Sequence, residues 1–209
     1  KNSIPLATRR AHLIPKTLQR VRQAFPQFVP GDSVFKTSFN NIGVVFHPAL
    51  MLLNAGWVED PADFEFYYQG TTTSVGVVLE KLDEERVAVA AALGFRAMSA
   101  REWLYYAYDC VGKTLFDAIH DNPGYRGILA PHNTQMRYIT EDVPCSLVPM
   151  SSLGQKFGVE TPIMDAFIAL ASAMHRQDYR AQGRTVERLG LAGLDLQQLR
   201  LLAIGEDVR

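Results

Sequence analysis

Two segments of the sequence place titratable or charged side chains among apolar and aromatic residues. His47 stands in the strongly apolar run Asn41–Asn54, and Asn54 lies two helical turns further on, on roughly the same face of a helix. Arg137 and Asp142 stand together in a second segment. An imidazole can give or take a proton near neutral pH, and a guanidinium can hold a carboxylate through two parallel hydrogen bonds. These residue types suit acid–base chemistry on an anionic substrate.

Each of these residues also has a purely structural interpretation. His47 could cap a helix by bonding to backbone groups, and Arg137 could form an ion pair with Asp142 or with other neighbours. The turn at 183–185 places the cation of Arg184 before an expected helix. We interpret it as mainly architectural, because glycine permits the turn and Thr185 can cap the helix. The residues alone leave both alternatives for His47 and Arg137 open.

Other residues that often carry chemistry give weaker signals. Tyr67 and Tyr68 could line a pocket, although adjacent aromatic residues belong more often to a core. No two of the five histidines have the spacing of metal ligands, so we expect no metal. Cys110 and Cys145 are too few for a disulfide framework or a cysteine-rich zinc site, which favours a reducing, cytoplasmic setting.

The composition excludes several classes of protein. The 21 basic and 22 acidic side chains give a net charge of −1, which argues against nucleic acid as a partner. Hydrophobic residues make up 47% and charged residues 21%, as in soluble globular proteins. We expect no membrane span and no signal peptide, because the apolar runs are short and the first residues lack the pattern. No glycine-rich phosphate-binding motif occurs in the sequence.

The first residues predict a small α/β segment. Lys1–Thr8 alternates weakly, as a short strand does, and Thr17–Phe25 has helical spacing that Pro26 ends. One strand and one helix cannot form a domain, so we expect residues 1–35 to be the end of a larger α/β unit. An N-terminal arm packed on a helical body is the alternative.

From Asn41 onward the sequence carries helix start and stop signals, which predict about seven helices. A short β excursion is expected near Phe64–Tyr68. Pro48 should be the first residue of an apolar helix that Gly56 closes. A long helix should open at Ser74 and end with Gly94 as its C′ residue. The charged face of that long helix should be solvated and without function: Glu80, Lys81, Asp83, Glu84, Glu85 and Arg86.

Four further helices are predicted from their end signals. Ser99 and Glu102 form a capping box that opens a helix through Tyr108. The remaining three are predicted at Thr161-Pro162 onward, at Thr185–Gly190, and from the cap Asp195 to Gly205.

Eight runs of the sequence share their order and spacing with a known family. They are His47–Gly56, Phe66–Gly70, Leu82–Arg86, Arg137–Pro144, Leu147–Pro149, Thr161-Pro162, Gly183–Thr185 and Leu189–Leu191. Together they resemble the C-terminal domain of the opine dehydrogenases. This is the octopine/nopaline dehydrogenase family, which includes bacterial enzymes of the N-(1-carboxyethyl)norvaline type. The resemblance covers essentially the whole chain.

The resemblance implies a mainly α fold and an oxidoreductase activity. Residues 36–209 should form a helical substrate-binding and catalytic domain, like the C-terminal domain of 6-phosphogluconate dehydrogenase, and residues 1–35 a remnant of a Rossmann domain. The implied reaction condenses an amino acid with a 2-oxo acid reductively, giving a secondary amine dicarboxylate. By resemblance, His47 is the catalytic histidine, Asp142 its partner and Arg137 the keto-acid ligand. We add as substrate-contact candidates Asn54, Tyr67 and Tyr68, with Trp103 as another wall residue.

The implied partners are the two substrates, NAD or NADP, and the protein's own Rossmann domain, which would bind most of the cofactor. A homodimer is a candidate assembly. We expect the 209 residues alone to be inactive without that domain. Two rival hypotheses stay open: a non-catalytic helical interaction or dimerisation module, and a 2-oxo or hydroxy acid reductase that uses no amine.

Overall fold

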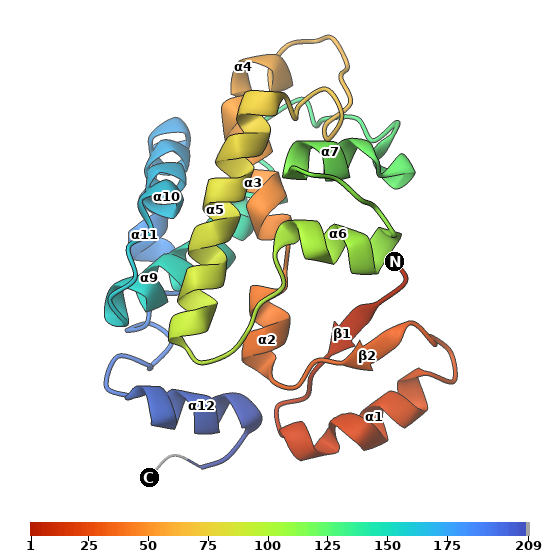
Figure 1. Cartoon of the computed structure of the whole chain (residues 1–209). Helices are drawn as coiled ribbons and strands as arrows, with labels where there is room; N and C mark the ends of the chain where they lie inside the picture. Colours follow the sequence, from red (N-terminus) through yellow and green to blue (C-terminus); the bar gives the residue numbers. More distant parts are fainter. Residues whose placement is uncertain (208–209) are drawn as a thin grey trace.

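The computed structural model describes residues 1–207 and consists of a helical body that carries a small α/β segment at one end (Figure 1). The mainly α fold is therefore confirmed. The α/β segment comprises β1 (Ile4–Leu6), a 3-10 turn (Ala11–Leu13), α1 (Ile14–Val21) and β2 (Phe28–Pro30). The body comprises α2 (Val34–Phe39), α3 (Gly43–Leu53), α4 (Ala55–Val58), α5 (Thr73–Ala92), α6 (Ala100–Tyr108), α7 (Leu115–His120), η2 (Pro123–Tyr125), α8 (Arg137–Thr140), the π-helix η3 (Val143–Leu147), α9 (Val148–Lys156), α10 (Pro162–His175), α11 (Tyr179–Gln182) and α12 (Leu196–Ile204).

The α/β segment is a strand–helix–strand unit with parallel strands. β1 and β2 pair in the register Ile4 to Phe28 and Leu6 to Pro30. The expected strand is confirmed, but the expected helix starts earlier and ends at Val21, because Pro15 in its first turn fixes the start. β2 was not predicted, since three residues are too short to show alternation.

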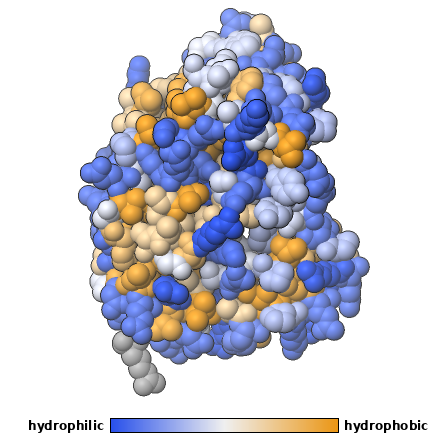
Figure 2. Space-filling view, viewed as in Figure 1, coloured by the Kyte–Doolittle hydropathy of each residue, from blue (hydrophilic) through white to orange (hydrophobic). Residues whose placement is uncertain are grey.

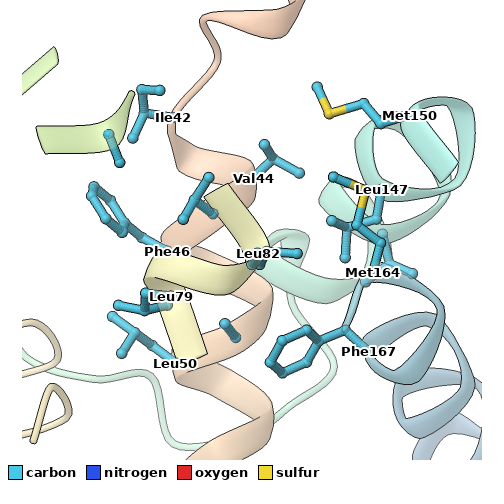
Figure 3. Close-up of a cluster of buried hydrophobic side chains, with 14 of the residues drawn as sticks. Ile42, Val44, Phe46, Leu50, Leu79, Leu82, Leu147, Met150, Met164 and Phe167 are labelled. Carbon is cyan, nitrogen blue, oxygen red and sulfur yellow. The ribbon is translucent and has the colours of Figure 1, made fainter. Parts of the chain in front are cut away.

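α3 lies at the centre of the body and supplies much of its core. Its residues Val44, Phe46 and Leu50 are buried against Leu79 and Leu82 of α5 and against side chains from η3, α9 and α10 (Figure 3). Such close packing on several sides holds α3, and any polar side chain that α3 carries, in one place.

The predicted start of α3 at Pro48 is wrong. The helix begins at Gly43, and Pro48 lies inside it. Pro48 has no N–H to donate to the Val44 carbonyl, but Val44, Val45 and Phe46 are almost fully buried, and their burial offsets the missing bond. Gly56 does not close this helix either: α3 ends at Leu53. His47 therefore stands within α3, not at its mouth.

The charged face of α5 is only partly solvated, which corrects a second prediction. Asp83 and Arg86 are buried, and the Arg86 guanidinium binds the Asp83 carboxylate and the backbone carbonyls of Phe39 and Met98. Glu80 accepts from the N–H of Leu115, and Glu85 accepts from the first N–H groups of α10. These carboxylates cap neighbouring helices, a role that depends on tertiary contacts.

Local end signals predicted other helices correctly. The capping box at Ser99, the cap at Asp195 and the C′ position of Gly94, which has a left-handed backbone, are confirmed. α5 starts one residue before Ser74 and is capped by Thr72. Residues 186–190 form turns, so the helix expected over 185–190 is absent from that stretch, and the β excursion is a single bridge between Glu65 and Leu129. The sequence analysis did not predict α2, α4, α7, α8, α9 and α11 as separate helices.

The surface is mixed in character. The face seen in Figure 2 is largely hydrophilic, with hydrophobic side chains gathered in separate patches. None of the helices within residues 1–207 has both the length and the apolar sequence that crossing a bilayer would need.

Candidate active site

His47 and Asp142 form a polar pair between α3 and the start of η3. Their Nδ1 and Oδ2 atoms lie 2.8 Å apart, and their side chains are 18% and 14% exposed. Asp142 directly precedes the π-helix, a distortion that often marks functional sites because it redirects side chains. The structure thus brings together two residues that are far apart in sequence and were predicted as partners.

Two tyrosines complete the surroundings of the imidazole. The Tyr67 hydroxyl lies 3.2 Å from His47 Nε2, and the Tyr138 ring stacks on the imidazole with centroids 4.1 Å apart. Burial, and then the neighbouring Tyr138, Tyr108 and Asp142, raise the pKa of Tyr67 well above its ordinary value. Its hydroxyl therefore keeps its proton and can donate a hydrogen bond.

These contacts assign the ring nitrogens of neutral His47. Asp142 can only accept, so Nδ1 carries the hydrogen, and Nε2 accepts from Tyr67. When His47 is protonated, Nε2 gains a hydrogen that it can give to a group beside it. The arrangement therefore directs one exchangeable proton, at Nε2, away from Asp142.

A cavity of about 430 Å³ lies beside the imidazole. It is walled by the β1 side of the α/β segment and by α2, α3, α6 and α8, and its residues include Pro5, Thr37, His47, Tyr67, Trp103 and Arg137. Trp103 lies at the far wall with the Lys1 ammonium 5.0 Å from its ring centroid. The cavity thus combines aromatic walls with fixed positive charge.

Arg137 is an exposed residue of this cavity, at the first position of α8. Within residues 1–207 its guanidinium makes neither an ion pair nor a side-chain hydrogen bond. The ion pair of Arg137 with Asp142 or Glu141 is not formed: Asp142 binds His47, and Glu141 makes no ion pair among residues 1–207. A guanidinium without a partner at a cavity wall is available to an anionic ligand.

Two candidate residues lie away from the cavity. The Asn54 amide donates to the backbone carbonyls of Leu50 and Gly70, which ties α3 to the following loop. The Tyr68 hydroxyl donates to the carbonyl of His120, and its ring faces Arg126. Both side chains serve the fold here, so the structure does not bring Asn54 and Tyr68 to the predicted substrate site.

Three cavity or ring contacts were missed by sequence reasoning. Tyr138, which stacks on His47, and Tyr125, which stacks on Tyr67 with ring centroids 4.1 Å apart, were given no role in the sequence analysis. Asn40 is 8% exposed, and its buried Nδ2 has no partner among the residues that the structure describes. No periodic pattern in the sequence indicates these three residues, because their contacts arise only where segments distant in sequence meet in the fold.

A larger hollow of about 780 Å³ lies elsewhere, beside α9 and α10. Its polar residues Ser151, Asp165 and Arg180 bond to one another. The described residues contain no group of three or more histidine, cysteine, aspartate or glutamate side chains that could hold a metal ion. The His47 cavity differs from this hollow in that its arginine has no side-chain partner among residues 1–207.

The fold and this cavity define a helical domain in which a histidine paired with an aspartate, and an arginine without a partner among residues 1–207, border one cavity. The family model described as NAD/NADP octopine/nopaline dehydrogenase, alpha-helical domain, matches residues 30–175, and the chain belongs to this family. An opine dehydrogenase from Arthrobacter sp. (strain 1C) is 41% identical over 183 residues, which are 88% of this chain and 51% of the relative. A D-nopaline dehydrogenase from Agrobacterium tumefaciens (strain T37) is 33% identical over 111 residues, 53% of this chain and 27% of the relative.

Solved structures agree on the fold. Octopine dehydrogenase with NADH and L-arginine superposes with a TM-score of 0.72 at 22% identity, covering 93% of this chain and 55% of that one. The complex with NADH and pyruvate gives a TM-score of 0.69, with 93% and 53% covered. The chain spans about half the length of the relatives that it matches.

Proposed function

We propose that this chain is the helical catalytic domain of an NAD(P)-dependent opine dehydrogenase. The enzyme would condense the amine of an amino acid with a 2-oxo acid and reduce the resulting imine. One observation carries the proposal: His47, which is paired with Asp142, lines the same cavity as Arg137, whose guanidinium has no partner within residues 1–207. Family membership and the pyruvate complex of octopine dehydrogenase support a small 2-oxo acid as one substrate.

The two functional groups would divide the work. Arg137 would hold the carboxylate of the 2-oxo acid with its planar fork, so that the carbonyl carbon is fixed in orientation. Protonated His47 would give its Nε2 proton as the amine condenses and water leaves, and Asp142 would hold the ring in the required orientation. The carbonyl oxygen that departs as water must then lie within hydrogen-bond reach of Nε2.

The residues present fit the reacting end of a nicotinamide cofactor but not its phosphates. The cavity beside His47 has aromatic walls against which a nicotinamide ring could lie. No glycine-rich phosphate turn occurs in the sequence, so a separate dinucleotide-binding domain would hold the rest. When bound, the cofactor supplies the hydride. The parallel β1–α1–β2 unit supports our assignment of residues 1–35 to the end of that domain.

The amine substrate would lie along the aromatic wall. Tyr67, Tyr125, Tyr108 and Trp103 follow one another there, with ring centroids between 4.1 and 5.9 Å apart. Our proposal also includes a homodimer and a cytoplasmic location. The free thiols of Cys110 and Cys145 support the cytoplasmic location.

The test is an assay of the full-length protein with a matrix of amino acids and 2-oxo acids, using NADH and NADPH in turn. We expect NAD(P)H oxidation that requires both substrates, with a secondary amine dicarboxylate detected by mass spectrometry. Oxidation with the 2-oxo acid alone would support the hydroxy-acid reductase instead. No oxidation with any pair, from folded protein, would support the non-catalytic module.

A further inference from the structure

α3 begins with a glycine that lies against the imidazole of His47. Gly43 precedes His47 by about one helical turn, and the side chain of a helical residue covers the turn before it. A Cβ on Gly43 would lie 2.9 Å from His47 Cε1 and 3.1 Å from Nδ1, the atom bound to Asp142. The ring thus occupies the space that any side chain at position 43 would take.

The backbone itself does not call for glycine at this position. Gly43 lies in α3 and is not among the residues with positive φ. In a helix, alanine is more favourable than glycine because it loses less backbone freedom on folding. A glycine in the first turn of the central helix therefore needs an explanation other than conformation.

We propose that Gly43 is a positioning residue of the active site. Its missing Cβ lets the His47 imidazole lie back against the first turn of α3, where Asp142 and Tyr67 reach its two nitrogens. This inference rests on the proposed function and adds a residue that acts through His47.

The surroundings of the ring show what a Cβ would disturb. Asp142 of the η3 start holds Nδ1, Tyr67 holds Nε2, and Tyr138 of α8 covers one face. Arg137 and Lys1 are the charged residues of the cavity that the ring borders. The atoms that would have to move belong to the ends of two side chains, the His47 ring and, at 3.3 Å, the amide oxygen of Asn41. The fold can therefore accept a Cβ at position 43, whereas the hydrogen bonds of His47 cannot stay as they are.

The experiment compares Gly43→Ala with Gly56→Ala in the full-length protein. Gly56 is also helical, in α4, but a Cβ there would meet nothing within 4 Å. We expect both variants to melt at the wild-type temperature or above it. Gly43→Ala should lose at least about tenfold in kcat, because a small misplacement of a reacting group is costly. It should also lose the hydrogen-bonded Nδ1–H proton signal of His47 in NMR, identified by its absence in His47→Gln.

The outcomes separate this proposal from the proposed function. If Gly43→Ala keeps both the NMR signal and the wild-type kcat, Gly43 is not a positioning residue. If the wild type oxidises no NAD(P)H, the proposed function fails, and the NMR signal alone decides about Gly43. If Gly43→Ala does not fold, the double variant Gly43→Ala/His47→Ala should restore folding, since the ring is gone. A double variant that stays unfolded would overturn the proposal.

Discussion

Arg137 and His47 line the cavity from different helices, and their side chains are held by the fold to different degrees. The His47 imidazole is held by Asp142, Tyr67 and Tyr138, whereas the Arg137 guanidinium is exposed and has no partner within residues 1–207. A held imidazole suits a group that must transfer a proton at a fixed point. A cation without a partner suits a group whose counter-ion arrives with the substrate.

Arg137→Lys should damage substrate binding without damaging the fold. The variant keeps the positive charge but loses the planar fork, and a charge-assisted hydrogen bond is worth about 1.5–3 kcal/mol. We therefore expect kcat/KM for the 2-oxo acid to fall at least about tenfold. The melting temperature and the KM for NAD(P)H should remain as in the wild type.

Steady-state kinetics against each substrate, with a melting curve of the same preparation, measures this. A destabilised variant with a normal KM for the 2-oxo acid would show that Arg137 has a structural role instead.

The sequence predicted the site residues unevenly, for a physical reason. His47, Arg137 and Asp142 stand out because their residue types and their order in the motifs are distinctive. Asn54 was placed on the face of His47 by helical spacing, but its amide is used by the carbonyls of Leu50 and Gly70. Which carbonyl lies opposite an amide depends on how loops return to a helix, and one sequence does not contain that information.

At the scale of elements, the buried pair on α5 connects three parts of the body. Arg86 is 0% exposed and binds Asp83, while the other Asp83 oxygen accepts from the N–H of Ala100 at the start of α6. Arg86 also binds carbonyls at the end of α2 and before α6. Removing one member leaves a buried charge without its partner.

We expect Asp83→Ala to lower the free energy of unfolding by about 3–5 kcal/mol, as for other broken buried pairs. Lys81→Ala is the matched control, because Lys81 pairs with Glu84 on the exposed side of the same helix. Urea unfolding of the three proteins measures the difference. Equal midpoints for Asp83→Ala and Lys81→Ala would show that the pair does not stabilise the fold.

Helix ends were easier to predict than helix faces. The caps at Ser99 and Asp195 are local, because a side chain and a backbone N–H three residues away suffice. The start of α3 and the buried face of α5 depend instead on neighbouring elements. The charged residues in the run 80–86 would give the same sequence pattern whether that face of the helix contacted solvent or another helix. The pattern alone therefore does not show which of these residues are buried.

At the scale of the whole molecule, stability should fall in alkaline solution. Burial is the main reason that the pKa values of Tyr67 and Tyr125 are raised. Unfolded tyrosine loses its proton near pH 10. Above that pH the unfolded chain binds fewer protons than the folded one, so the free energy of unfolding decreases as pH rises.

Urea unfolding between pH 8 and about pH 11 measures this decrease. The double variant Tyr67→Phe/Tyr125→Phe should show a shallower decrease than the wild type. The matched control is Tyr105→Phe/Tyr106→Phe, whose side chains are 52% and 55% exposed, and it should keep the wild-type slope. A wild-type slope in the Tyr67/Tyr125 variant would contradict the assignment.

α12 touches both parts of the chain. A Cβ on Gly205, which follows α12, would lie 2.2 Å from the carbonyl oxygen of Arg9 in the α/β segment, and Arg200 of α12 packs at Gly94, where α5 ends. Because Pro5 of β1 and His47 of α3 both belong to the cavity, α12 is one of the elements that join the two segments carrying its walls. Substitutions at this joint can therefore shift the α/β segment relative to the helical body, with every residue of the cavity left as it is.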